Sequence, residues 1–242
     1  MAIWFTTANY SGSIHLWQLS DATMKTFCQS SGWSLFPDAD LPIAQGIRYT
    51  NAQDCFRGKL LCSLEGHVSG VSAIAFSTDR QTLISGSFNG TVKIWQLDRG
   101  ELVSALNAHS GTVKSMAVSA DGKLLATGSA DRSLKIWVLP HAALLYALPE
   151  QDDAIASLCF SRDGKWLVCG MQNGTISVWD TDTGKQHTTF NAHFGAVKSL
   201  ILSSDGRTLA SSSVERTIKV WDISSRHPCP HPHRTSISPY SS

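Results

Sequence analysis

The chain has 242 residues, of which 42% are apolar, with 18 glycines and a formal net charge of +1. This apolar content is enough for a buried core, and the length suits one large all-β domain. The near-neutral charge, with acidic and basic residues interspersed, excludes the basic stripe that binds nucleic-acid phosphates, so no nucleic-acid partner is predicted.

The six cysteines show no CxxC spacing, and two of them, Cys159 and Cys169, lie in strand-like apolar runs. We interpret these two as small buried hydrophobes rather than disulfide partners or metal ligands. The start, from Met1 to Phe5, lacks the features of a signal peptide, and no apolar run approaches the ~18 residues of a membrane span. The prediction is a soluble, cytoplasmic protein without a membrane partner.

Residues 1–27 resemble the back part of a longer repeated unit. The segment from Ser13 to Trp17 alternates polar and apolar residues and ends in tryptophan, and Ile3 to Asn9 precedes it as a second strand. The opening strand of the unit would have to lie before Met1. We therefore predict a partial unit here.

Residues 28–57 interrupt the repeat. Pro37 and Pro42 break any strand, and no tryptophan closes the segment. Two interpretations stay open, a long insertion in a loop and a degenerate repeat. A long loop within a compact domain is commonly functional or disordered, which makes the segment a candidate binding feature.

Residues 58–222 contain four regular units with a period of 42 residues, marked by tryptophans that each close an alternating strand: Trp95, Trp137, Trp179 and Trp221. Each unit is predicted to hold an outer strand, a loop and three further strands, and such a period is typical of stacked β-sheets. The last unit lacks an outer strand. Residues 223–242 are rich in Pro, Ser and His and are predicted to form a disordered tail.

Short motifs recur at both ends of these units. Gly66-His67, Ala108-His109 and Ala192-His193 stand near the starts, and Trp179-Asp180 and Trp221-Asp222 stand at the ends. In this register the chain resembles the WD-repeat family of β-propellers. The resemblance implies an all-β propeller of four-stranded antiparallel blades, four of them clear, one partial and one possible degenerate. WD-repeat propellers most often have seven blades, so we predict an incomplete or truncated ring.

The resemblance also implies a hydrogen-bond network in each blade that joins a loop histidine, a strand hydroxyl, a turn aspartate and the tryptophan. Carried over by position, the network is predicted to be complete only for His109, Ser129 (or Thr127), Asp131 and Trp137. The other blades keep the members His67, Asn89, Trp95, Asn173, Trp179, His193, Glu215 and Trp221, with Gln151 at one histidine position.

These repeated His, Asp and Ser residues are interpreted as framework, because catalysis needs one convergent set rather than partial copies around a ring. No catalytic residue, cofactor or metal is predicted. In the tail, from His227 to His233, every second residue is a proline. These prolines hinder the segment from wrapping around one metal ion. Lys93, Lys135 and Lys219 share one strand position and are interpreted as solvated side chains that discourage edge pairing.

Propellers bind partners at the channel mouth, through the turns before the closing strands and the loops after the histidines. The residues at these positions vary while the framework repeats, which is typical of specificity positions. The partner-binding candidates are Tyr10, Val68, Phe88, Ser110, Ala130, Asp152, Gln172, Phe194 and Val214. Phe88 and Phe194 are the strongest, unless each packs on a neighbouring blade.

We therefore predict a non-catalytic scaffold that binds a protein or peptide partner. The alternatives are a regulatory or sensor segment of a larger signalling protein, and a ligand-binding or enzymatic propeller whose channel is lined near Ser115, Ser157 and Ser199. An unclosed ring would also leave blade edges open, so self-association through those edges is part of the prediction.

Overall fold

The computed structural model describes residues 3–19, 59–223 and 227–228, and within these residues the regular structure consists of β-strands without a helix. The alternation of polar and apolar residues predicts such strands, and short turns join most of them. The predicted all-β fold is confirmed. Nothing in the described part of the chain forms a helix that could cross a membrane.

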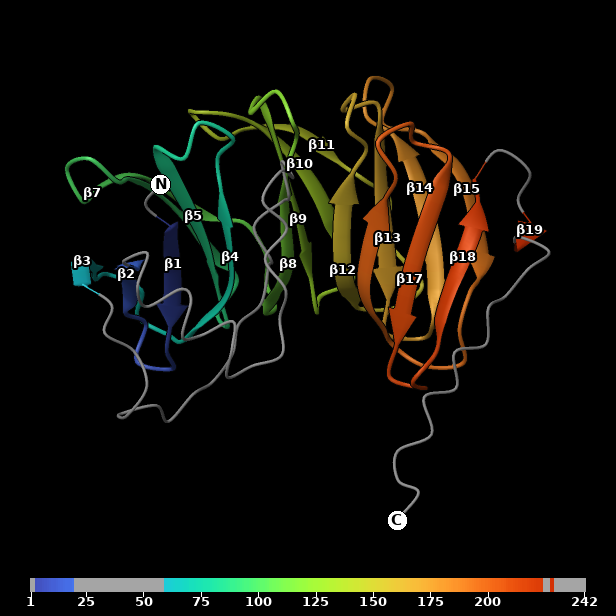
Figure 1. The fold of residues 1–242 in the computed structure, drawn as a ribbon, viewed down its shortest axis with the longest axis horizontal. Helices are drawn as coiled ribbons and strands as arrows, with labels where there is room; N and C mark the ends of the chain where they lie inside the picture. Colours follow the sequence, from blue (N-terminus) through green and yellow to red (C-terminus); the bar gives the residue numbers. More distant parts are fainter. Residues whose placement is uncertain (1–2, 20–58, 224–226, 229–242) are drawn as a thin grey trace, which may run out of the picture.

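Five antiparallel sheets, numbered here from first to fifth, follow one another in chain order (Figure 1). The first contains β1 (Ile3–Ala8), β2 (Ile14–Leu19) and β3 (Lys59–Leu64). The second contains β4 (Val71–Phe76), β5 (Thr82–Ser87), β6 (Thr91–Gln96) and β7 (Glu101–Asn107). The third contains β8 (Val113–Val118), β9 (Leu124–Ser129), β10 (Leu134–Val138) and β11 (Ala143–Ala147). The fourth contains β12 (Ile155–Phe160), β13 (Trp166–Met171), β14 (Thr175–Asp180) and β15 (Gln186–Asn191). The fifth contains β16 (Val197–Leu202), β17 (Thr208–Ser213), β18 (Ile218–Asp222) and β19 (His227–Pro228).

The sheets are arranged as the blades of a β-propeller. In each four-stranded sheet the strands pair in chain order, and the inner strands β4, β8, β12 and β16 of consecutive sheets lie next to one another. Among the described strands, the fifth sheet does not pack on the first as consecutive sheets pack on each other. The ring is therefore incomplete, as predicted.

Both ends of the array differ in detail from the prediction. β3 pairs with β2, so Lys59–Leu64 completes the first sheet instead of opening the unit that follows. At the other end Asp222 pairs with His227 of β19, which gives the fifth sheet a short outer strand from the segment predicted as a disordered tail. The predicted insertion or degenerate blade at residues 28–57 lies outside the described residues. The proposed division of the chain at residues 27, 57 and 222 remains a prediction.

The hydrophobic core lies between consecutive sheets. One face of each sheet contributes aliphatic side chains, and the facing sheet contributes its inner strand and its tryptophan. Between the fourth and fifth sheets, Val168, Ile176 and Val178 pack with Val197 and Trp221. The repeating tryptophan is thus the side chain with which one blade covers the blade before it.

Consecutive sheets lie in tight contact at one position of the second strand. A Cβ atom added to Gly128 would lie 2.8 Å from Cβ of Ile155 and closer still to its Cγ2, and one added to Gly170 would lie 2.6 Å from Cγ1 of Val197. Gly86 is the equivalent residue in the second sheet. Carbon atoms do not approach each other this closely, so the packing of these blades requires glycine.

Candidate functional site

In the third sheet a chain of hydrogen bonds joins the buried tryptophan to the loop before the inner strand. Nε1 of Trp137 donates to Oγ1 of Thr127 at 2.9 Å, and Oγ1 of Thr127 lies 2.8 Å from Nε2 of His109. Nδ1 of His109 lies 2.6 Å from Oγ of Ser133, which donates to Oδ1 of Asp131 at 2.6 Å. Because the indole only donates, we infer that the threonine hydroxyl donates to Nε2 and that the histidine carries its hydrogen on Nδ1.

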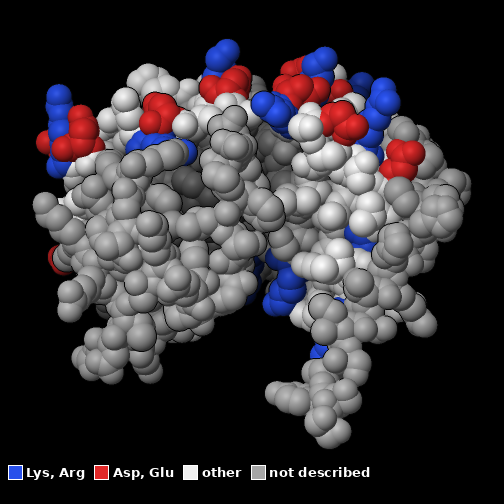
Figure 2. All heavy atoms as spheres, in the orientation of Figure 1, with Lys and Arg blue, Asp and Glu red and all other residues white. Residues whose placement is uncertain are grey.

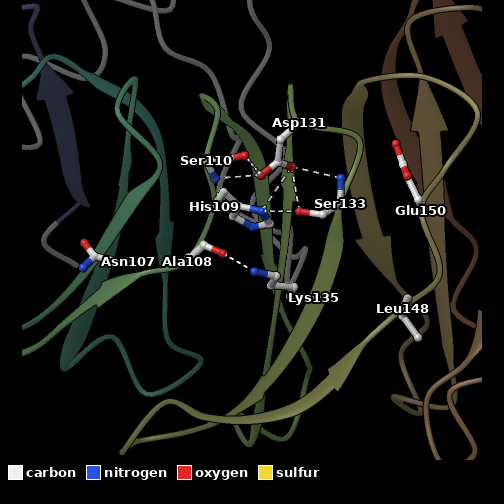
Figure 3. A pocket seen from close by; sticks show the side chains of 9 residues that line it. All are labelled: Asn107, Ala108, His109, Ser110, Asp131, Ser133, Lys135, Leu148 and Glu150. Atoms are coloured by element: carbon white, nitrogen blue, oxygen red, sulfur yellow. Dashed lines mark hydrogen bonds and ion pairs between the residues drawn. The ribbon is translucent and has the colours of Figure 1, made fainter.

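Asp131 ends this chain of bonds and ties a turn to a loop (Figure 3). Oδ1 accepts the backbone N–H of Ser133 at 2.9 Å, and Oδ2 accepts the backbone N–H of Ser110 at 2.8 Å. Burial by itself would raise the pKa of this carboxyl, but the hydrogen bonds from Ser133 and Ser110 outweigh it and hold the pKa well below its usual range. The ionised carboxylate therefore fixes the turn before β10 against the loop before β8.

The bridging hydroxyl belongs to Thr127 and not to Ser129. Thr127 pairs with Lys135, two residues before Trp137, which places its hydroxyl within reach of both the indole and the imidazole. Ser129 lies further along β9, and its Oγ accepts the N–H of Asp131 at 3.1 Å. In the 42-residue register this position holds a hydroxyl at Ser85, Thr127 and Ser211 and a thiol at Cys169, which is a sequence signal that identifies the bridging position.

The fifth sheet carries an equivalent chain with glutamate at the aspartate position. Nε1 of Trp221 donates to Oγ of Ser211 at 2.8 Å, and this hydroxyl lies 2.7 Å from Nε2 of His193. Nδ1 of His193 lies 2.6 Å from Oε1 of Glu215, and Oε2 accepts the backbone N–H of Phe194 at 3.0 Å. The carboxylate again joins a turn to a loop.

The network is therefore complete in two blades, which corrects the prediction that only the blade of Trp137 completes it. Hydrogen bonds from the side chains of Thr217 and His193 lower the pKa of Glu215 to about 2, so the group is ionised at neutral pH. The longer glutamate side chain makes the same contacts as Asp131 because its two oxygens still reach the histidine and the loop N–H.

In the second sheet the same chain ends on a neutral amide. Nε1 of Trp95 donates to Oγ of Ser85 at 2.8 Å, and this hydroxyl lies 2.7 Å from Nε2 of His67. Nδ1 of His67 lies 3.3 Å from Oγ1 of Thr91, which donates to Oδ1 of Asn89 at 2.8 Å. Hydrogen bonds to ionised groups are about twice as strong as neutral ones, so this end of the chain is the weaker one.

The fourth sheet connects its tryptophan differently. Cys169 stands at the bridging position, and Nε1 of Trp179 donates instead to Oγ of Ser177 at 2.9 Å. Ser177 in turn donates to Oε1 of Gln151 at 3.3 Å, while Asn173 accepts only the backbone N–H of the next strand among the contacts described. Burial raises the pKa of the Cys169 thiol to about 12, which leaves it unreactive at neutral pH.

The lysines of the third strands hold the loops rather than point to solvent. Nζ of Lys93 donates to the carbonyl of Gly66 at 2.7 Å, and Nζ of Lys219 donates to the carbonyl of Ala192 at 2.7 Å. Lys135 makes the same bond to Ala108. The interpretation of these lysines as solvated side chains that discourage edge pairing is therefore wrong. Each has a structural role, since it donates to a loop carbonyl beside the histidine.

We expect the free energy of unfolding to decrease as the pH falls from about 6.5 to about 4. Burial lowers the pKa of His67 and of His109 to about 4, whereas an unfolded histidine titrates near pH 6.5. In this window the unfolded chain binds more protons than the folded chain. Each histidine therefore lowers the free energy of unfolding, by on the order of 3 kcal/mol at most. The measurement is the denaturation midpoint at a series of pH values.

The matched variant for this prediction is His109→Gln, which copies the residue found naturally at Gln151. It should flatten the pH dependence between pH 6.5 and 4 because it removes one of the titrating groups. A pH profile as steep as that of the unmodified chain would show that buried histidine does not control this dependence.

The partner-binding candidates lie at one end of the sheets, where turn and loop meet. In the second to fifth sheets the turn residue donates its backbone N–H to the loop, with Phe88 to Gly70 at 3.0 Å and Val214 to Ala196 at 3.1 Å as examples. Figure 1 shows this end at the bottom of the view, below β1 and β17. Eight of the nine candidates are exposed, and Phe88 is the exception: Tyr10, Val68, Ser110, Ala130, Asp152, Gln172, Phe194 and Val214.

The two phenylalanine candidates have different environments. Phe88 is half-buried, with its ring stacked on Tyr10 at 5.5 Å between centroids, so it packs on the neighbouring blade. Phe194 is 98% exposed. Its closest described ring contact is the ammonium of Lys219, 5.9 Å from the centroid. Of the two phenylalanine candidates, Phe194 is thus the one that presents its whole ring to solvent.

A groove of about 620 Å³ lies beside the network of the third sheet (Figure 3). Its walls include His109, Asp131 and Lys135. The histidine side chain is fully buried and both ring nitrogens are hydrogen-bonded, so it is not placed to take a proton from a substrate. Ser115, one of the residues predicted to line the channel, accepts the backbone N–H of Leu158 at 3.0 Å and thereby links two blades.

Acidic and basic side chains are mixed along the opposite end of the sheets. Figure 2 shows them alternating along the upper edge of the view, where the turns between first and second strands lie. Asp121 and Lys123 illustrate the mixture, at 3.8 Å from each other in one turn. This edge does not form the uniform basic surface that phosphate binding requires.

Comparisons with known proteins agree with this architecture. The family model described as the first β-propeller of IFT122 matches residues 50–240. A curated relative, the U3 small nucleolar RNA-associated protein 15 homolog of Rattus norvegicus, is 39% identical over 62 residues, which are 25% of this chain and 12% of the relative. A solved structure described as that of U3-55K aligns with a TM-score of 0.65 and 24% identity, over 69% of this chain and 53% of the other. At this identity the structural match shows the fold alone.

The predicted cytoplasmic location is contradicted by the curated relative, whose name associates it with a small nucleolar RNA. The prediction rested on the start of the chain, which lacks signal-peptide features, on the lack of an apolar run long enough to span a membrane, and on cysteines without a disulfide pattern. Cytoplasm and nucleus both keep thiols reduced, so cysteine usage does not distinguish the two compartments.

Proposed function

The chain belongs to the WD-repeat β-propeller family, in the group described as the first β-propeller of IFT122, and from this we propose that it is a non-catalytic scaffold. It binds a protein or peptide through the end of the blades that carries the turn and loop residues. The observation that most supports a binding role is the exposure of Phe194. Its side chain is 98% exposed, although it is attached to a hydrogen-bonded framework that repeats from blade to blade.

The framework gives the exposed residue a fixed position. The backbone N–H of Phe194 is held by Glu215, which is itself bonded to His193. Val214 packs over Gly195 in the same corner of the fifth sheet. A rigid aromatic side chain on a fixed backbone loses little conformational entropy on binding, which is why aromatic residues dominate binding hot spots.

The chemistry of this corner favours an apolar side chain of a protein partner over a phosphate backbone. Phe194 and Val214 offer apolar surface, and the ammonium of Lys219 is already bonded to a carbonyl and lies 3.5 Å from Glu215. The name of the curated relative mentions an RNA, so the experiment has to separate RNA-mediated capture from direct capture.

We expect Phe194→Ala to reduce capture of the protein partner by about tenfold or more, as removal of an aromatic hot spot does. The measurement is affinity capture from lysate with a tagged chain, with and without ribonuclease. The denaturation midpoint should not change, because the ring is exposed.

The control is Val103→Ala, an exposed apolar residue on β7, away from the turn and loop residues. It should leave capture unchanged. Equal capture by the Phe194→Ala variant and the unmodified chain would contradict the proposal, as would capture that ribonuclease abolishes.

A further inference from the structure

A small cavity lies between the fourth and fifth sheets, at the end of the sheets opposite to the partner-binding candidates. Its walls come from the turns before β13 and β17, from β15 and from the residue after β18. Its volume is about 220 Å³. Pockets that take drug-sized ligands have roughly 300–1,000 Å³, so this cavity is suited to a single side chain.

Two aromatic rings form one wall of the cavity. The centroid of the Trp166 ring, at the start of β13, lies 4.8 Å from that of His187 on β15. Trp166 is half-buried and His187 is exposed. The other sheets do not repeat this pair, since the equivalent residues are Thr82 and Val103 in the second sheet and Leu124 and Leu145 in the third. The aromatic wall is therefore not part of the repeating framework.

The facing turn of the fifth sheet leaves the space in front of this wall open. A Cβ atom added to Gly206 would meet no atom within 4 Å beyond the adjacent residues. In the equivalent gap between the second and third sheets, a Cβ added to Gly122 would lie 3.1 Å from Oγ1 of Thr78. The gap is thus filled by a side chain in one contact between sheets and open in the other.

Two carboxylates add negative charge to the cavity. Oδ1 of Asp163 accepts the hydroxyl of Ser161 at 2.6 Å, and Oδ1 of Asp205 accepts the hydroxyl of Ser203. These hydrogen bonds lower the pKa of both carboxyl groups, so both are ionised at neutral pH. Each Oδ1 also accepts one backbone N–H, and no other described residue donates a hydrogen bond to either Oδ2. The two Oδ2 oxygens are therefore available to a cation.

Aromatic rings beside free carboxylate oxygens match the chemistry of a guanidinium group. This group is planar, weakly hydrated and always charged, it stacks on aromatic rings, and its N–H groups bond carboxylates in pairs. The ammonium group of lysine is more strongly hydrated and has no flat face to stack. Two aspartates do not supply the six or more oxygen ligands of a calcium ion, and they would repel a phosphate.

We propose that this cavity binds the side chain of an arginine from a protein partner. The guanidinium lies against Trp166 and pairs with the carboxylates of Asp163 and Asp205, and the alkyl part of the side chain contacts Ile223. Arg207 also lines the cavity, and its positive charge opposes that of the bound arginine. Because β13 separates this cavity from Gln172 at the other end of the sheet, the site is distinct from the one proposed around Phe194.

The test uses N-acetyl-arginine N-methylamide, which presents an arginine side chain on a neutral peptide backbone. We expect it to shift the indole N–H signal of Trp166 in proton–nitrogen NMR spectra of the full chain, with saturation. The signal is identified by its loss in Trp166→Phe. The citrulline analogue has nearly the same shape but no charge, and it should bind about tenfold more weakly or less.

Asp205→Asn is the variant that tests the carboxylate. It removes one charge but keeps an oxygen that accepts the same two hydrogen bonds, so the turn should be preserved. We expect arginine binding to weaken by about threefold or more, because the carboxylate is exposed. Arg207→Gln should strengthen binding. The matched control is Asp121→Asn, at the same turn position of the third sheet and outside the cavity, which should leave binding unchanged.

Three results would overturn the proposal: no saturable shift of the Trp166 signal, equal binding of the citrulline and arginine analogues, and equal binding by Asp205→Asn and the unmodified chain. Free arginine that binds more tightly than the blocked form would show that the cavity takes the amino acid and not a protein side chain, which also contradicts it. None of these results depends on capture through Phe194, so the two proposals fail separately.

Discussion

The Gly128→Val substitution is expected to lower the free energy of unfolding by about 3 kcal/mol or more. Gly128 lies on β9 where the third sheet touches the fourth, and an added Cβ would come within 2.8 Å of Cβ of Ile155. Ile155 is fully buried and branched at Cβ, so it has no room to rotate away. The blades would have to separate, and urea denaturation monitored by tryptophan fluorescence would measure the loss.

The same substitution in the fifth sheet provides the control. Ser212→Val changes the equivalent residue on β17, where no described sheet packs on that face. We expect a change within about 0.5 kcal/mol, as for other surface positions. Equal losses at the two positions would show that the fifth sheet is covered in the same way as the third.

The second large effect is expected for Thr127→Val. This substitution keeps the shape of the side chain but removes the hydroxyl that bonds both Nε1 of Trp137 and Nε2 of His109. Both nitrogens belong to buried residues, and an unsatisfied buried polar atom costs about 1–3 kcal/mol. We therefore expect a loss of about 2–4 kcal/mol in the free energy of unfolding, together with faster hydrogen exchange of the Trp137 indole.

Cys169→Val is the matched control, because Cys169 holds the same position in the fourth sheet. The indole of Trp179 donates to Ser177 instead and keeps this partner in the variant. The expected loss is about 1 kcal/mol or less, the usual cost of a nearly isosteric change in a core. A loss as large as that of Thr127→Val would mean that packing, rather than hydrogen bonding, determines stability at this position.

The fold could be predicted from the sequence because one pattern repeats in register. The alternation before Trp95 and Trp221 specifies strands with one apolar face, and the constant spacing specifies equivalent blades. The network members could be placed by position for the same reason. The choice between Thr127 and Ser129 could not, because both side chains lie on one face of β9 and only their distances to the histidine separate them.

The sequence predicted which positions form the candidate site, but not which of their side chains are exposed. Phe88 stands in a turn before a closing strand and Phe194 in a loop after a histidine, and the sequence does not show that one stacks on Tyr10 and the other is exposed. Glu215 stands where the network has aspartate, and only the three-dimensional reach of its side chain shows that it completes the same bonds.

By itself the sequence determined the period, the strands, the blade type and the residues that recur in each blade, because these depend on local alternation and fixed spacing. The tertiary structure decided which blade faces are covered. Thr-Ile-Lys-Val-Trp at residues 217–221 has the same pattern as Thr-Val-Lys-Ile-Trp at residues 91–95, but Val92 is buried and Ile218 is exposed. The reason is that a sheet buries its apolar face only against a neighbouring sheet, and the presence of that neighbour is a property of the assembled array and not of the strand.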